Sequence, residues 1–253
     1  MQHFCKNGYD SYAEFYDTWH DRWPENSKMH CVDKLAEIAA GEAALELGIG
    51  TGRLGLPLAQ KGVPVYGIDN SEPMLNKLRA KPGSENLSVV CGDFSGIPVE
   101  GVFGLIYTVL SFGYLLTQQE QVRCFVNARQ KIKPGGAFVI QTAVPRPNIF
   151  NGSNQVDDIF DIPSEDGAEL DAVMLLCSKT DVVRQLIDQR VIVLGEAGPK
   201  IFTHQRRYVW PSELDLMAQI AGFTLDGRWG GWRQEPFTAK SPTQISVYRL
   251  AES

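Results

Sequence analysis

Hydrophobic and polar residues alternate along the chain in two rhythms, and the change between them falls near residue 145. Before that point, short apolar runs alternate with segments that repeat apolar residues at helical spacing. The runs predict strands at 43–48, 63–69, 87–93, 101–110 and 133–142, and the spaced segments predict helices at 53–62, 71–81 and 118–133. Alternating strands and helices with short links predict a doubly wound parallel sheet covered by helices on both faces.

The second part of the chain has a different pattern. Residues 145–169 are rich in Pro, Asn, Asp, Gly and Ser and are predicted to form a loop. Residues 170–209 contain two or three strand-like runs, and 181–195 and 200–210 predict an antiparallel hairpin across the turn at Gly195–Pro199. A capped helix and a last hairpin, 223–231 with 243–250, follow. The pattern predicts an α/β fold with an antiparallel β insertion after its fifth strand.

Composition restricts the class of protein. The chain has 253 residues, 43% of them hydrophobic, which suits one elaborated domain or two small ones. A net charge of -6 without a basic stretch argues against nucleic acid or an anionic membrane as partner. The N-terminus lacks signal-peptide features, and five scattered cysteines without a C-x-x-C pair favour free thiols over a metal site. We therefore expect a cytoplasmic protein that binds no metal.

The glycine-rich loop after the first strand is compatible with two cofactors. Gly50, Gly52 and Gly55 spell G-x-G-x-x-G, whereas Gly48, Gly50 and Gly52 spell the tighter G-x-G-x-G. Glycines let the backbone approach a ligand at the carboxyl end of a strand. Asp69 ends the second strand, where a carboxylate can accept both ribose hydroxyls. These residues fit a nicotinamide dinucleotide and an adenosyl cofactor equally well.

Further features separate the two cofactors. Glu46 lies inside the first strand, Asp93-Phe94 follows the third, and Lys133-Pro-Gly-Gly136 precedes the fifth. In this order they resemble the class I S-adenosylmethionine-dependent methyltransferases, with E-x-G-x-G-x-G as the first motif, over nearly the whole chain. The resemblance implies a Rossmann-like, seven-stranded core and S-adenosyl-L-methionine as cofactor. The residues it implies for cofactor binding are Tyr16, Glu46, Gly48, Gly50, Gly52, Asp69, Asn70, Met74, Asp93, Phe94 and Thr108.

The N-terminal segment narrows the resemblance. Ala13–Asp17 has the A-x-x-Y-D form with which many small-molecule methyltransferases begin, and this implies that Tyr16 reaches over the cofactor. Residues 1–40 are accordingly expected to form a helical lid. Tyr12, Phe15, Tyr16 and Trp19 also form a helical stripe that could simply dock on the core. Both roles are compatible in one tyrosine.

The candidate acceptor site lies between the core and the insertion. Tyr114 stands where antibiotic-pathway sugar N-methyltransferases have the histidine of S-x-G-H-L, so the resemblance carries no histidine base to this position. The insertion, 146–209, should cover the acceptor site on the cofactor-binding core, which consists of residues 41–145 and 210–253. Alternation puts Phe202, His204, Arg206 and Tyr208 on one strand face. Tyr16, Tyr114 and His204 are the catalytic candidates, and the acceptor contacts are predicted to be Phe112, Tyr114, Phe202, His204, Arg206, Trp229 and Trp232.

The reaction is predicted to be methyl transfer to a nitrogen, oxygen or activated carbon of a small molecule, as in natural-product metabolism. The sequence leaves two alternatives open: an NAD(P)-dependent oxidoreductase, and a protein that uses S-adenosylmethionine for chemistry other than methylation. The expected assembly is a monomer or a homodimer, with neither nucleic acid nor a membrane as partner.

Overall fold

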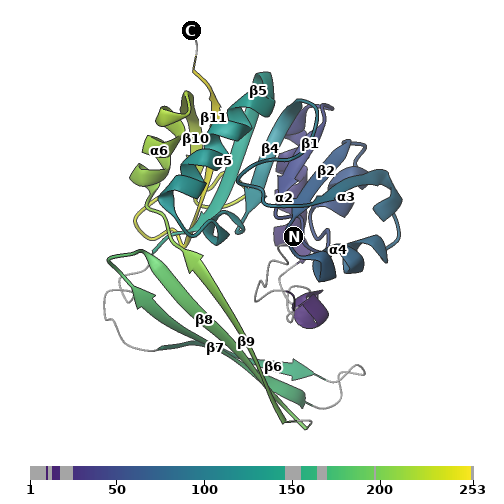
Figure 1. Ribbon diagram of the computed structural model, residues 1–253, viewed down its shortest axis with the longest axis vertical. Coiled ribbons are helices and arrows are strands. Elements are labelled where there is room, and N and C mark those ends of the chain that lie inside the picture. The colour runs from purple at the N-terminus through teal and green to yellow at the C-terminus, as the bar shows by residue number, and fades with distance from the viewer. Residues whose placement is uncertain are drawn as a thin grey trace, which may run out of the picture.

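A computed structural model of the chain describes Asp10 and residues 13–17, 25–145, 155–163, 170–196 and 198–251. The described residues form two sheets (Figure 1). The larger sheet has seven strands in the order β10-β11-β5-β4-β1-β2-β3. Its strands are β1 (Ala44–Leu47), β2 (Val65–Asp69), β3 (Leu87–Cys91), β4 (Phe103–Val109), β5 (Ile132–Ala143), β10 (Phe223–Trp229) and β11 (Thr243–Leu250). The predicted doubly wound, seven-stranded α/β fold is confirmed.

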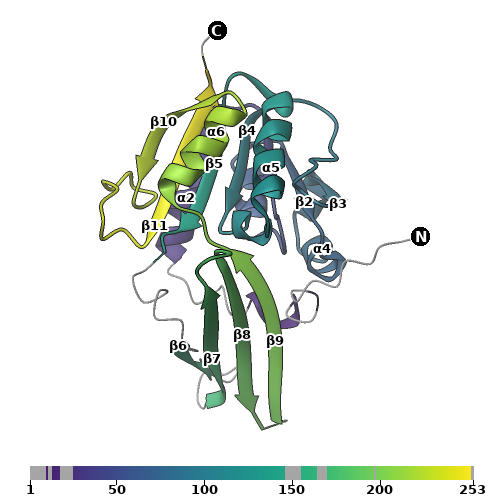
Figure 2. The same ribbon diagram turned by 60° about the vertical axis from the view of Figure 1, so that its left-hand side comes forward.

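Helices cover both faces of this sheet. One face carries α2 (Glu25–Ala39), α3 (Gly55–Gln60) and α4 (Glu72–Arg79), and the other carries α5 (Gln118–Lys131) and α6 (Pro211–Ile220), which Figure 2 shows side by side. Short 3-10 turns lie at Ser84–Asn86 (η1) and Phe112–Tyr114 (η2). The buried strands are apolar on both faces, as parallel strands between two helical layers must be. Helices 53–62, 71–81 and 118–133 are thus confirmed, with shorter bounds.

Helix α5 buries a stripe that the sequence pattern did not identify. The apolar periodicity of 118–133 predicts that Val122, Phe125, Val126 and Ala128 face the core, but Val126 is 37% exposed and Val122 only partly buried. The buried residues of α5 are Gln121, Cys124, Phe125 and Ala128, at helical spacing. The stripe shifts by one residue because the Gln121 side chain finds buried partners, donating to the Leu115 carbonyl and accepting from Arg207.

The insertion is a separate antiparallel sheet of four strands, in the order β6-β7-β8-β9. Its strands are β6 (Gln155–Pro163), β7 (Leu170–Asp181), β8 (Leu186–Gly195) and β9 (Gly198–Arg207). The predicted hairpin of β8 and β9 is confirmed. Two expectations were wrong. Part of the supposed loop 145–169 is β6, which pairs with β7, and residues 182–185, read as part of a strand, form the turn from β7 to β8.

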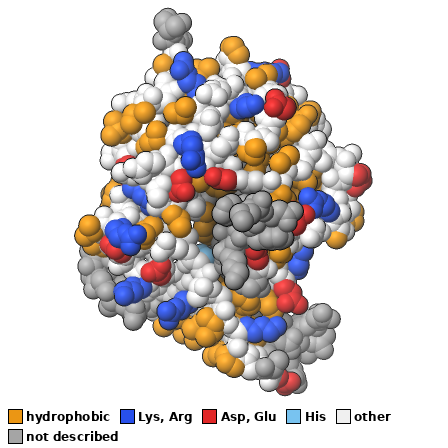
Figure 3. Space-filling model, in the orientation of Figure 1, with side chains coloured by type: hydrophobic (Ala, Val, Ile, Leu, Met, Phe, Trp, Pro, Cys, Tyr) orange, Lys and Arg blue, Asp and Glu red, His pale blue; other side chains and the backbone are white. Residues whose placement is uncertain are grey.

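A charged partner surface, a membrane span and a metal site would each require a particular arrangement of side chains among the described residues. On the face in Figure 3, positive and negative side chains are interspersed among hydrophobic ones. Among the described helices, none is long and apolar enough to cross a bilayer. Within those same ranges, no three His, Cys, Asp or Glu side chains are grouped as a metal site would require.

Candidate active site

The glycine loop after β1 is shaped by close packing and by one carboxylate. Gly48 and Gly52 have φ of +83° and +79°, and a Cβ on Gly48 would lie 2.6 Å from the Ser111 Cβ. Asp69, at the end of β2, accepts hydrogen bonds from the Gly50 N–H (2.8 Å) and the Ser71 N–H (2.9 Å). Ser71 in turn caps α4, accepting from the Met74 N–H. One carboxylate therefore holds both turns at the carboxyl edge of the sheet.

Asp69 keeps capacity to bind a ligand while it holds these turns. Burial raises the pKa of its carboxyl, and the hydrogen bonds from Ser71, Gly50 and Asn70 act in the opposite direction. An ionised carboxylate has about four lone-pair sites, more than the three backbone hydrogen bonds use. The remaining capacity is available to a ribose hydroxyl.

Glu46 is the buried acid of β1, only 4% exposed. Its Oε2 accepts from the Tyr107 hydroxyl at 3.0 Å, and a Cβ on Gly55 would lie 3.0 Å from the same oxygen. Burial raises the pKa of this carboxyl to about 8, against lowering contributions from Tyr107, Arg53 and Gly55. At neutral pH Glu46 is therefore mostly protonated.

This protonation should make stability depend on pH. A carboxyl whose folded pKa lies above its unfolded value of about 4.3 binds its proton more tightly in the folded state. Stability should therefore fall as pH rises from about 4.3 towards 8, and Glu46→Gln should reduce that slope. Urea unfolding of the wild type and of Glu46→Gln across this pH range measures the slope of stability against pH. An identical slope in the variant would show that Glu46 is ionised in the folded protein at neutral pH.

The N-terminal segment contacts the glycine loop and α4. The Thr51 hydroxyl donates to Asp17 Oδ1 at 2.5 Å, and Lys81 pairs with the same carboxylate at 2.8 Å. The Ser71 hydroxyl donates to Asp10 at 2.7 Å. Residues 10 and 13–17 thus lie over the candidate cofactor loop, as a lid would. Tyr12 and Trp19 of the expected stripe lie outside the described residues.

Aromatic side chains from the lid, the core and the insertion come together beside this loop. Tyr16 and Phe15 pack on a cluster of the insertion that contains Phe202, with the rings of Phe15 and Phe202 5.5 Å apart. The rings of Tyr114 and His204 are 6.1 Å apart, edge to face. Burial raises the pKa of Tyr16 to about 12, with Arg53 lowering it and Tyr114, Asp69 and Glu46 raising it. Tyr16 therefore lies between the glycine loop and the insertion.

His204 sits on β9 opposite Gln189 of β8. Its Nε2 is 2.6 Å from Oε1 of Gln189, whose side chain is buried, so we assign the proton to Nε2. Burial, followed by the charge of Arg206, lowers the pKa of His204 to about 4. The imidazole is consequently neutral at physiological pH and can accept a hydrogen bond through Nδ1.

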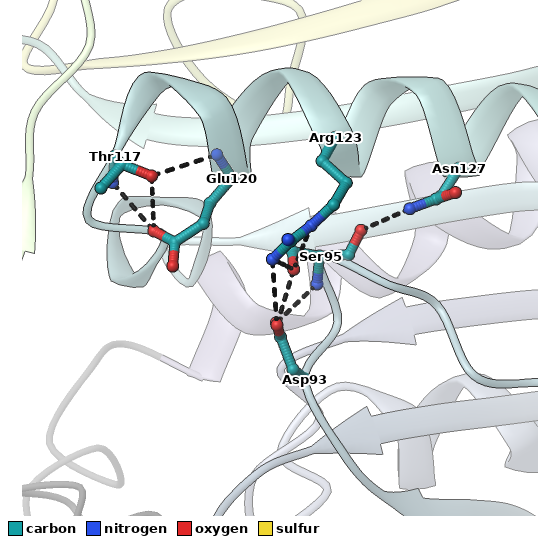
Figure 4. A network of polar contacts seen from close by, with 6 residues as sticks. All are labelled: Asp93, Ser95, Thr117, Glu120, Arg123 and Asn127. Carbon is teal, nitrogen blue, oxygen red and sulfur yellow. Dashed lines mark hydrogen bonds and ion pairs between the residues drawn. The ribbon is translucent and has the colours of Figure 1, made fainter.

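Asp93 belongs to a polar network on the side of α5 (Figure 4). Its oxygens accept from the backbone N–H of Ser95 at 2.8 Å, the Ser95 hydroxyl at 2.6 Å and Arg123 at 3.4 Å. Asn127 donates to the Ser95 carbonyl at 2.8 Å. The network fixes a half-exposed carboxylate at the end of β3, and its predicted contact with an adenine amino group stays a prediction.

The remaining aromatic acceptor candidates pack in other hydrophobic clusters than Phe202, and three of the remaining cofactor candidates are buried. Phe112 is fully buried edge-to-face on Phe125, which leaves no exposed surface for the acceptor contact expected of it. Trp232 donates to Gln141 at 2.9 Å and packs with Trp229 on the α2 side of the sheet, in another hydrophobic cluster than Phe202. Met74, Phe94 and Thr108 are buried near the strand ends, and the Thr108 hydroxyl finds no partner among the described residues.

Sequence reasoning missed Arg53 and Gln189. Arg53 follows the glycine loop, and its charge acts on Tyr16, Glu46 and Cys31. Among the described residues it has neither a hydrogen-bond partner nor an ion-pair partner. A cation directly after G-x-G-x-G was a usable signal. Gln189 offered none, because only the hairpin register brings it to His204.

Comparisons with known proteins agree with this geometry. The family described as "Methyltransferase domain" matches residues 44–136. The CcbJ methyltransferase from Streptomyces caelestis superposes with a TM-score of 0.83 and 34% identity, over 97% of this chain and 98% of that one. The cypemycin N-terminal methyltransferase of a Streptomyces species is 26% identical over 208 residues, 82% of each chain. CalS10, an amino pentose methyltransferase from Micromonospora echinaspora, shares the fold (TM-score 0.67, 19% identity, covering 94% of this chain and 95% of that one).

The Rossmann-like sheet and its glycine loop define an α/β enzyme that binds a nucleoside-containing cofactor at the strand ends. The chain belongs to the S-adenosylmethionine-dependent methyltransferases, and S-adenosylmethionine is its cofactor. Because the chain belongs to this family, the alternative that it is an NAD(P)-dependent oxidoreductase is excluded.

Proposed function

We propose that the enzyme methylates an amine nitrogen of a small molecule. The observation that carries this is the convergence of Tyr16, Tyr114 and His204 between the lid, η2 and β9, with His204 neutral at physiological pH. The cypemycin and amino pentose enzymes, which resemble this chain, are named for N-terminal and amino sugar substrates. Natural-product metabolism, where such substrates occur, is part of the proposal.

The glycine loop and its neighbours fit the cofactor. Gly48 and Gly52 let the loop turn tightly with positive φ against Ser111 and Leu78. Asp69 would supply an acceptor for the ribose, and Arg53 a cation for the methionine carboxylate. Asp10 and residues 13–17 would then exclude water from above. When bound, S-adenosylmethionine supplies an electrophilic methyl group on its sulfonium.

The site's own contribution is positioning more than base catalysis. A histidine with a pKa of about 4 is a weak base, far from the value that favours general-base catalysis near neutral pH. His204 and Tyr114 can instead hold the amine by hydrogen bonds, with its lone pair in line with the methyl group. The buried aromatic walls keep water out, and the product proton leaves to solvent.

The direct test is turnover. Purified protein is incubated with S-adenosylmethionine and a panel of primary and secondary amines, phenols and activated carbon acids. We expect S-adenosylhomocysteine only with amines, and mass spectrometry should find the added methyl group on nitrogen. Turnover of phenols or carbon acids alone would contradict the amine assignment. Cofactor cleavage without a methylated product would favour the non-methylating alternative.

Phenylalanine substitutions test the two tyrosines. We expect Tyr114→Phe to lower turnover with little change in stability, because it removes only a hydroxyl beside His204. Tyr16→Phe should mainly raise the Michaelis constants, because the lid residue closes the site. The loss of a hydrogen bond worth about 1.5 kcal/mol should change the affected kinetic constant, turnover for Tyr114→Phe and the Michaelis constants for Tyr16→Phe, roughly tenfold. Steady-state kinetics of both variants measure this, and wild-type constants in both would make the tyrosines packing residues.

A further inference from the structure

Arg206 is a half-buried cation in the candidate acceptor site, and no described residue forms an ion pair with it. Its Nε is buried and has no hydrogen-bond partner, and no ion pair or other hydrogen bond involves this side chain among the described residues. Burying a charge is costly unless it is paired and hydrogen-bonded. The neighbouring Arg207, by contrast, is satisfied by Gln121, Gln185 and Glu213.

Arg206 lies on the strand face that carries the candidate acceptor contacts. It shares a strand face with His204 and Phe202, and its charge acts on His204. A Cβ on Gly113 would lie 2.9 Å from the Arg207 carbonyl oxygen and 3.7 Å from the Arg206 Cβ. Glycine at position 113 thus lets β9 pack directly against η2, which carries Tyr114.

On β7, β8 and β9 the same sheet face carries no acid that could neutralise the charge. The acid that the register puts on this face is Asp158 of β6, which pairs with Leu176 and lies three strands away from β9. Strand register puts Ala172, Met174, Leu176 and Ser178 of β7 and Ile187, Gln189, Val191 and Val193 of β8 on this face, with Lys200, Phe202, His204 and Arg206 of β9. None of these side chains is acidic, and Lys200, the other cation, lies 4.6 Å from the Phe15 ring. The acids of β7 and β8, among them Asp188, lie on the opposite face.

We propose that the acceptor carries an anionic group, a carboxylate or a phosphate, and that Arg206 binds it while His204 and Tyr114 hold the amine. Arginine suits both groups because its planar fork donates two parallel hydrogen bonds to them. This inference rests on the proposed methyl transfer and adds the substrate class: amines with an oxyanion close to the nitrogen.

Matched acceptor pairs test the assignment. Amino acids are compared with their carboxamides, and amino sugar phosphates with the unphosphorylated amino sugars, by S-adenosylhomocysteine formation. The wild type should prefer one anionic series, and the series that prevails identifies the oxyanion. Arg206→Met should lower kcat/KM for that series about ten- to a hundredfold and change the neutral members little. Arg190→Met, which removes the same charge from the exposed opposite face of β8, should leave the preference unchanged.

A second measurement separates failure of this inference from failure of the methyl-transfer proposal. In protein saturated with S-adenosylhomocysteine, NMR follows the titration of His204, which has Arg206 of β9, Gln189 of β8 and Tyr114 of η2 as neighbours, while Tyr16 of the lid packs on the adjoining Phe202 cluster. Acetate or inorganic phosphate should raise the pKa of His204 in the wild type, because the anion offsets the charge of Arg206. In Arg206→Met the pKa should start higher and should not respond.

The outcomes are distinct. No turnover of any amine, with a His204 titration that responds to anions, would refute the methyl-transfer proposal and leave the anion site standing. Equal use of charged and neutral acceptors, or a His204 titration in the wild type that ignores both anions, would overturn the anion site.

Discussion

Replacing Asp69 by alanine should lower the affinity for S-adenosylmethionine about ten- to a hundredfold. The change removes charge-assisted hydrogen bonds to the ribose, together worth roughly 1.5–3 kcal/mol. It also frees the Gly50 and Ser71 N–H groups, which the carboxylate now fixes at 2.8 and 2.9 Å. Calorimetric titration of the folded variant with S-adenosylmethionine measures the loss.

Two further variants separate the ribose contacts from the turn geometry. Asp69→Asn keeps one carbonyl oxygen, which can serve one of the two turns, and should fall between the wild type and alanine. Asp226→Ala removes an exposed carboxylate that pairs with Arg249 on β11 and should bind cofactor normally. Unchanged affinity in a folded Asp69→Ala protein would disprove the ribose assignment.

The largest loss of stability should come from Arg207→Met. Arg207 is 4% exposed and donates to Gln121 (2.6 Å), Gln185 (2.7 Å) and Glu213 (2.5 Å). Removing one partner of a buried ion pair leaves the other charge without compensation, which costs about 3–5 kcal/mol. Because these partners belong to α5, the β7–β8 turn and α6, the change should loosen the insertion from the core. Equilibrium urea unfolding measures the loss.

The pH dependence provides a second readout of the same ion pair. Burial acts to raise the pKa of Glu213, but hydrogen bonds from Gln118, Gln185 and Arg207 outweigh it, and the net shift is downward. A depressed carboxyl pKa adds stability that is present above the unfolded pKa, near 4.3, and is lost as pH falls through the folded value. Arg207→Met should therefore flatten the acid limb of the stability profile.

A surface arginine serves as the matched control. Arg184 is exposed in the turn between β7 and β8, so Arg184→Met should change the free energy of unfolding by no more than about 0.5 kcal/mol. If Arg207→Met cost as little as Arg184→Met, the insertion would be held to the core by other contacts.

The sequence by itself determined the features that local chemistry controls. The strand–helix order up to residue 143 follows from apolar periodicity, and Ser71 with Pro73 marks the start of α4. The glycines at 48, 50 and 52 mark the loop after β1, and the structure has positive φ at all three. Such signals act within a few residues, so they can be read before any tertiary contact is known. They were sufficient for the order of strands and helices up to residue 143, whereas the choice of cofactor came from the order of the motifs that resemble the methyltransferases.

Only the tertiary structure decided what depends on contacts distant in sequence. Strand β6 contains Asp157, Asp158 and Asp161, poor strand formers, and it is a strand because β7 pairs with it. Gln121 replaces Val126 on the buried side of α5 because Arg207 of the insertion supplies its partner. The juxtaposition of His204 with Gln189 and Tyr114 depends on the β8–β9 register and on the packing of β9 against η2. Side-chain partners across strands and layers are fixed only when the whole chain packs. Sequence periodicity could therefore identify candidate residues such as His204, but it could not predict which of them lie in contact.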